Sequence, residues 1–195
     1  MTRRACAWVW LTGLVLLTGS CSVTVPLRNV AVAVPRTARL GPGRARFFVD
    51  RVKVPYRRDE RLGVKRSLAG DFWARVYSSG DLAAWAEREW LAFLRRHGQE
   101  VVTRVREADY LVTCDLLEVS ADKKYDWIWD DDFSGSVKLF VRIVDRRSGV
   151  TVFCRTLRGD HFLQRRGQYQ EYSDSDLLLL CASSAFQKAL EQITF

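Results

Sequence analysis

The sequence is poor in histidine, with only His97 and His161 in 195 residues. Neither histidine has a second ligand at the spacing typical of a metal site. The chain also lacks the GxSxG, P-loop and GxGxxG patterns that mark nucleophile elbows and phosphate-binding loops. We therefore expect a protein that is not an enzyme and that holds no metal ion and no cofactor.

A long membrane-spanning run is also missing. The longest uncharged apolar stretch covers residues 5–19, which is shorter than the roughly 20 residues that a spanning helix needs. Arg3 and Arg4 precede it, and a positive start followed by a short apolar run is typical of a secretory signal. We expect residues 1–20 to be a signal peptide.

This run ends in LTGSC at residues 17–21, which resembles the lipobox of bacterial lipoproteins. The resemblance implies that the Cys21 thiol carries a diacylglycerol, that the freed amine is acylated, and that membrane lipid holds the chain through these groups. Ser22 follows where an Asp would favour the inner membrane, so we expect an outer-membrane anchor and a periplasmic domain. An ordinary secretory signal with an incidental cysteine is the alternative.

Disulfide frameworks need paired cysteines, and this pattern is absent. Besides Cys6 and Cys21, the chain has Cys114, Cys154 and Cys181, an odd number without CxxC spacing. All three lie in apolar stretches, where a free cysteine usually packs as a small hydrophobic residue. The sequence does not decide whether two of them form a disulfide in an oxidising compartment.

Disorder is excluded by the composition, which is 48% hydrophobic with seven tryptophans. The net charge of +8 predicts a polyanionic partner. Because an exported protein does not meet nucleic acid, we expect none. Anionic lipid or lipopolysaccharide is the expected polyanion, and a charge that only maintains solubility is the alternative.

All four prolines fall in the first third of the chain. We expect the lipidated Cys21 and a tether over residues 21–43, followed by a single domain over residues 44–195. Apolar residues at helical spacing predict amphipathic helices at 81–97 and 173–193.

Alternating apolar residues predict strands, with DRRSG as a hairpin turn that ends at Gly149. The polar, basic residues 56–67 are expected to form a loop. The predicted strands cover residues 29–34, 45–54, 72–77, 109–119, 136–145 and 150–158. Half-buried strands of this kind are typical of antiparallel sheets. The predicted fold class is α+β, a two-layer sandwich of a mostly antiparallel sheet with two amphipathic helices on one face.

The segment KKYDWIWDDDF, residues 123–133, alternates aromatic and acidic side chains. We interpret Tyr125, Trp127 and Trp129 as a candidate contact site. The alternatives are cross-strand aromatic pairs with solvated acids at a turn, and carboxylates that hold a divalent cation, although nothing resembles an EF-hand loop.

A second candidate lies in residues 161–172, where Arg165, Arg166 and Tyr169 are expected to contact a polyanion. A plain connecting loop is the alternative for this segment.

The order of elements resembles the YajG-type family of bacterial lipoproteins. The likeness rests on LAAWAEREWLAFLRRHGQEVV (82–102), ADYLVTCDLLEV (108–119), GSVKLFVRIVDRRSGVTVFCRTLRG (135–159) and the last helix. It implies an outer-membrane-anchored envelope protein and no functional residues to carry over. The lipopolysaccharide-assembly lipoprotein LptE is similar in outline, but its usual Gly-Phe after the lipidated cysteine is replaced here by Ser22-Val23.

We therefore expect a non-enzymatic component of cell-envelope assembly or maintenance that binds an envelope protein. The alternative is an auxiliary lipoprotein for lipid or lipopolysaccharide transport, since auxiliary lipoproteins of lipid-transporting ABC systems are similar in outline. A hydrolase is the third hypothesis.

Overall fold

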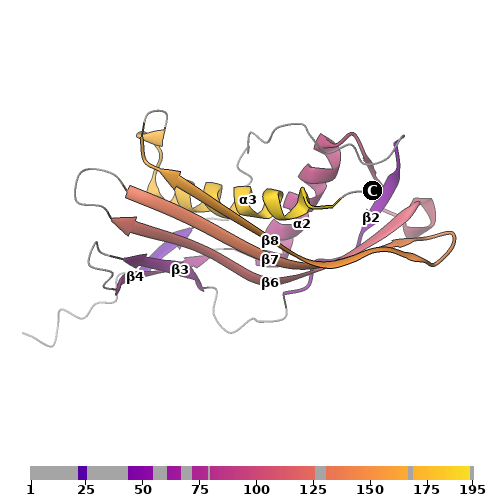
Figure 1. Ribbon diagram of the computed structural model, residues 1–195, viewed down its shortest axis with the longest axis horizontal. Helices are drawn as coiled ribbons and strands as arrows, with labels where there is room; N and C mark the ends of the chain where they lie inside the picture. The colour runs from indigo at the N-terminus through magenta and orange to yellow at the C-terminus, as the bar shows by residue number, and fades with distance from the viewer. Residues whose placement is uncertain are drawn as a thin grey trace, which may run out of the picture.

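The computed structural model describes residues 22–25, 44–54, 61–66, 72–78, 80–125, 131–166 and 169–193. These residues form a curled mixed sheet with two helices packed against it (Figure 1). A helical turn, η1 (Val105–Glu107), precedes the long strands. None of the helices in the described ranges is long and apolar enough to cross a bilayer.

Three long strands make the centre of the sheet, namely β6 (Tyr110–Tyr125), β7 (Asp131–Asp145) and β8 (Thr151–Gln164). They pair antiparallel in sequence order. The predicted turn between β7 and β8 is confirmed, and Gly149 adopts a φ of +70° there, a conformation that glycine accepts without strain.

The free side of β6 pairs with two different strands at its two ends. Strand β2 (Arg46–Val49) lies parallel to the start of β6, and β3 (Arg61–Arg66) lies parallel to its last residues. Beyond these, β5 (Glu100–Val101) pairs with β2, β4 (Phe72–Ser78) pairs with β3, and β1 (Ser22–Val25) pairs with β4.

This topology corrects the predicted fold class. Of the seven strand pairings among the described residues, four are parallel. The prediction of a plain, mostly antiparallel two-layer sandwich is therefore wrong, and the sheet is mixed and curled (Figure 1). The parallel pairs join segments that are far apart in the chain, which the hairpin pattern cannot reveal.

The predicted loop over residues 56–67 is also wrong, because β3 occupies its second half. Leu62 and Val64 are buried there, and the side chain of Lys65 is buried as well. Leu62 and Val64 do alternate with Gly63 and Lys65, but two apolar positions within a polar, basic segment are too short a pattern to identify a strand. The predicted strand over residues 29–34 lies outside the described residues.

Both predicted helices are confirmed. Helix α2 (Leu82–Arg96) begins at the cap Asp81, whose carboxylate accepts a hydrogen bond from the Ala83 amide at 2.8 Å, and it ends before Gly98 at φ +73°. The cap satisfies an amide that the first helical turn leaves without a partner. Trp85 and Trp90 of this helix are buried in the core.

Helix α3 (Asp174–Leu190) lies directly on β7 and β8 because two glycines remove the side chains between them. A Cβ at Gly135 would lie 2.4 Å from the backbone of Cys181, and one at Gly159 would lie 1.9 Å from the Ala185 carbonyl oxygen. This close approach buries nearly the whole helix.

Side chains near the end of α3 also cover the outer edge of β8. Lys188 donates to the carbonyl of Asp160, and Gln192 donates to the carbonyl of Arg158. An exposed edge strand invites pairing with other chains, so these two bonds protect the middle of β8.

Candidate functional site

The two segments that the sequence marked as contact sites come together at one end of the sheet. Tyr125 pairs with Asp131 across β6 and β7, and the Arg165 amide donates to the Asp131 carbonyl at 3.0 Å. This is the left end in Figure 1, where β6 and β8 finish and α3 begins. Trp127 and Trp129 lie outside the described residues.

A charge cluster occupies this end, formed by Lys65, Lys123, Arg165, Asp131 and Asp174. The Lys123 ammonium lies 2.7 Å from the Asp131 carboxylate and 3.0 Å from that of Asp174. Lys65 pairs with Asp174 at 2.7 Å, and Arg165 contacts both carboxylates. Each aspartate therefore meets at least two cations, and the cluster joins β3, β6, β7, the end of β8 and α3.

The ring of Phe133 lies beside the charge cluster. The Lys123 ammonium and the Arg165 guanidinium each lie 5.3 Å from its centroid, within the range of a cation–π interaction. Phe133 is fully buried and Lys123 is only 3% exposed. The aromatic face therefore offsets part of the cost of removing these cations from water.

The carboxylate of Asp174 is held in its charged form. Burial alone would raise its pKa, but hydrogen bonds from Lys65 and Lys123, together with their charges, lower it to about 2. For Lys123 burial acts in the opposite direction and would lower the pKa. The hydrogen bonds to Asp131 and Asp174 outweigh burial and raise the pKa of Lys123. The position of Asp174 in the first turn of α3 adds a favourable interaction with the helix dipole.

The ion pairs of the charge cluster hold Lys123 and Asp174 in their charged forms. General acid–base catalysis needs a group whose pKa lies near the working pH, and both partners of the Lys123–Asp174 pair are shifted away from neutrality. The cluster fixes the end of the sheet. Arg166, the next residue after Arg165, is exposed to solvent.

The sequence identified Arg165 as a candidate contact residue, but it did not predict the ion pairs that join the charge cluster. One signal was present, because Lys123 follows Val119 and Ala121 at alternate positions on the buried face of β6. A lysine on such a face needs an acidic partner. The sequence does not show which carboxylates are the partners of Lys123, since Asp174 lies 51 residues further along the chain.

The structure describes two of the other predicted residues, Tyr125 and Tyr169, at least in part. The backbone of Tyr125 ends β6, and Tyr169 is half-buried against the core. Cys21 lies outside the described residues. Within the described part of the chain, no three His, Cys, Asp or Glu side chains are grouped closely enough to hold a metal ion.

The three cysteines of the domain are free thiols. Cys114 and Cys181 are buried, and burial raises the pKa of each to about 12. A thiol is nucleophilic only as the thiolate, so these two serve as packing residues. Cys154 is exposed on β8.

A second buried polar group links the two helices. Glu89 of α2 is 4% exposed, and its carboxylate accepts hydrogen bonds from Ser183 at 2.9 Å and Gln187 at 2.6 Å on α3. Burial raises the pKa of Glu89, and the two hydrogen bonds oppose that shift in part. The network fixes the contact between α2 and α3.

Comparisons with known proteins were made for the sequence and for the fold. No family model matches the chain, and no curated protein matches it. Structures of similar outline include a Xanthomonas campestris protein of the family model DUF330, at 12% identity over 88% of this chain and 93% of that one, with a TM-score of 0.46.

Two further structures of similar outline come from other bacteria. The hypothetical protein CT253 of Chlamydia trachomatis is 14% identical over 76% of this chain and 94% of its own, with a TM-score of 0.49. Lipoprotein GNA1162 of Neisseria meningitidis is 15% identical over 69% and 90%, with a TM-score of 0.31. Scores below 0.5 carry no argument about function, and the YajG-type resemblance stays a prediction.

Proposed function

We propose that this protein is a lipid-anchored component of the bacterial envelope that acts by binding another protein rather than by catalysis. The signal-like start, the LTGSC segment and Cys21 support the anchor. The binding role is supported by the way exposed hydrophobic side chains are distributed over the domain.

That distribution is the observation that carries the proposal. Six large hydrophobic side chains are exposed in the described ranges, and four of them lie on β7, β8 or their connecting turn: Phe140 (36%), Val150 (57%), Val152 (48%) and Phe162 (57%). Helix α3 packs on the opposite face of β7 and β8, and no helix or strand in the described ranges covers this face. Exposed apolar side chains that share one uncovered face support an interaction surface there.

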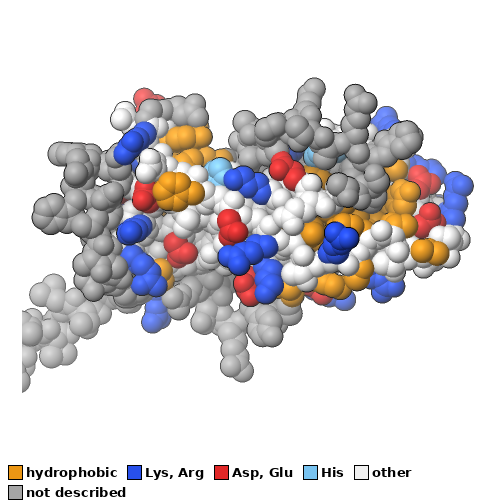
Figure 2. Space-filling model, in the orientation of Figure 1, with side chains coloured by type: hydrophobic (Ala, Val, Ile, Leu, Met, Phe, Trp, Pro, Cys, Tyr) orange, Lys and Arg blue, Asp and Glu red, His pale blue; other side chains and the backbone are white. Residues whose placement is uncertain are grey.

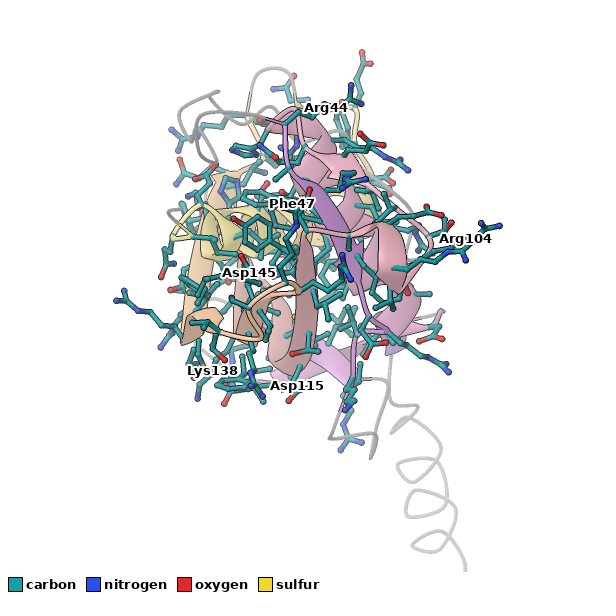
Figure 3. The ribbon with its side chains drawn as sticks, turned by 90° about the vertical axis from the view of Figure 1, so that its right-hand side faces the viewer. Arg44, Phe47, Arg104, Asp115, Lys138 and Asp145 are labelled. Atoms are coloured by element: carbon teal, nitrogen blue, oxygen red, sulfur yellow. The ribbon has the colours of Figure 1, made fainter. Side chains whose placement is uncertain are left out.

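Charged side chains of both signs lie among these hydrophobic side chains, since Lys138 pairs with Glu118 and Arg158 with Asp160. Lys138 and Arg142 alternate with Phe140 along β7, and Arg158 lies directly across from Lys138 on β8. Figure 3 shows Lys138 and Asp115 on the side of the sheet away from α3. Complementary charge favours a partner that presents an apolar contact rimmed by acidic residues.

A site-specific crosslink tests the proposal in the native cells. A photoreactive amino acid placed at Phe140 or Phe162 of the full chain should give one adduct of defined mass. The same group at Val105, which is also exposed but belongs to η1 rather than to β7 or β8, is the matched control. Arg142→Glu/Arg158→Glu should abolish the adduct, and equal labelling from all three positions would contradict the proposal.

Auxiliary function in lipid or lipopolysaccharide transport remains the alternative proposal. It requires a lipid cargo, so the purified full chain would carry phospholipid or lipopolysaccharide in stoichiometric amount beyond the acyl groups on Cys21. Phosphate analysis and mass spectrometry of the same sample measure this. A cargo-free protein with a retained crosslink supports protein binding instead.

A further inference from the structure

The sheet begins directly after the proposed lipid-attachment residue. Ser22 is the first residue of β1, and it pairs with Arg75 of β4. Covalent geometry places the Cα of residue 21 about 3.8 Å from that of Ser22. The anchor is therefore joined to the folded sheet with no intervening flexible segment.

The direction of the strands shows which end of the sheet this anchor leaves from. Strand β1 runs parallel to β4, whose first residue, Phe72, pairs with Arg66 at the end of β3. Arg66 in turn pairs with Lys124 at the end of β6. The start of β1 thus points toward the end that holds the charge cluster (Figure 1).

Several exposed cations lie at that end among the described residues. We define the basic end by four exposed side chains, Arg66, Arg75, Lys124 and Arg166. Two described acids lie near these cations: Glu171 is exposed, and Asp132 pairs with Lys124 across β6 and β7. Tyr172 adds an exposed aromatic ring. In Figure 2, Lys and Arg side chains lie at the left of the molecule as well as over its middle and right, with Asp and Glu side chains among them.

We infer that the basic end rests on an anionic membrane surface and contacts the lipid phosphates. This inference rests on the proposed function, because it needs an acylated Cys21. Only about three residues of strand, roughly 10 Å, separate the level of Ser22 from the end of the sheet. The distance from the four cations to the headgroups is therefore comparable to the Debye length of about 8 Å. At this distance the cations attract anionic lipid.

The opposite end faces away from the membrane in this arrangement. The turn at Val150 is separated from the basic end by the length of β7, whose 15 residues span roughly 50 Å. The part of the uncovered face that carries Phe140 and Val152 then stands away from the bilayer, accessible to a partner, whereas Phe162 lies near the basic end. Val150 is exposed and provides a matched reference position.

Headgroup quenching tests the orientation on the full, natively processed chain. A fluorophore is attached to Lys124→Cys or to Val150→Cys, each in a Cys154→Ser background; the buried Cys114 and Cys181 stay unlabelled. The protein is reconstituted into phosphatidylcholine vesicles with or without one quarter phosphatidylglycerol and a headgroup quencher. We expect at least threefold stronger quenching at position 124 than at 150 in anionic vesicles, and weaker quenching at 124 in neutral vesicles or with Arg66→Glu/Arg166→Glu.

The outcomes separate the two proposals. Mass spectrometry of the same sample reports the acyl groups on Cys21. An acylated protein with equal quenching at 124 and 150, or with no response to anionic lipid, overturns the orientation alone. An unmodified Cys21 overturns the lipid anchor and, with it, the inference.

Discussion

The ammonium of Lys65 lies 2.7 Å from the carboxylate of Asp174, although the two residues are 109 positions apart in the chain. Lys65 belongs to β3 and Asp174 begins α3, so this ion pair joins the short strands at one end of the sheet to the helix that covers the long ones. Lys123 shares the same carboxylate. The pair therefore depends on the complete tertiary structure.

Replacing Lys123 with methionine should lower the free energy of unfolding by about 3 kcal/mol. The substitution removes a buried cation and leaves Asp131 and Asp174 with fewer positive partners, which is costly in a poorly solvated site. Denaturation in urea at pH 7 measures the loss. Lys138→Met is the control, since Lys138 pairs with Glu118 on the surface and should cost less than about 0.5 kcal/mol. Equal effects would contradict the role of the charge cluster.

Stability should fall in acid because of Asp174. Its pKa is about 2 in the folded protein and 3.8 in the reference state, so the folded state binds the proton more weakly. The stabilisation is complete above pH 4 and disappears as the pH falls toward 2, by about 2 kcal/mol. In unfolding measurements, Asp174→Asn should be less stable than the native chain by about 2 kcal/mol at pH 7 and by less than half of that at pH 2.5, where the folded carboxylate is still partly charged. A constant difference would refute this.

Glu89→Gln should stabilise the protein at pH 7 by about 1 kcal/mol. Burial raises the pKa of Glu89 above its value in the unfolded chain. The contribution of Glu89 to stability therefore decreases as the pH rises from the unfolded-state pKa toward the folded-state pKa. A neutral amide avoids that loss, and it can donate to the Gln187 side-chain oxygen, which lacks a partner in the described structure. Thermal unfolding from pH 4 to 8 measures the effect, and it should shrink near pH 4. Glu87→Gln on the same helix should change nothing; a destabilised Glu89→Gln would exclude this reading.

Gly159→Ala should destabilise the fold by at least about 3 kcal/mol. The new methyl group would meet the Ala185 carbonyl at 1.9 Å and the Ala189 amide nitrogen at 2.6 Å, and neither backbone atom can rotate away. Gly149→Ala is the control, because its site is open and only its positive φ opposes a side chain, at a cost of about 1 kcal/mol. Similar losses in both variants would mean that α3 moves away easily.

Local patterns predicted much of the secondary structure. The helices α2 and α3 and the hairpin of β7 and β8 were predicted from residues that lie next to one another in the chain. The positions of their ends followed from Asp81, Gly98 and Gly149, whose capping and turn chemistry is local. The candidate site was predicted only in part, because Arg165 was identified from its exposed, basic neighbourhood and its buried partners were not.

What the sequence by itself determined is therefore the set of elements, their inward faces, and the signal-like start that ends at Cys21. Only the tertiary structure decided that β2 and β3 pair with opposite ends of β6, that Lys65 and Asp174 meet, and that β1 begins directly after Cys21. Periodicity shows which face of a helix or strand is apolar. It does not show which other strand that element pairs with, because many strand edges are equally compatible with an apolar face. The choice among them depends on packing and charge pairing between distant segments, which no local window contains.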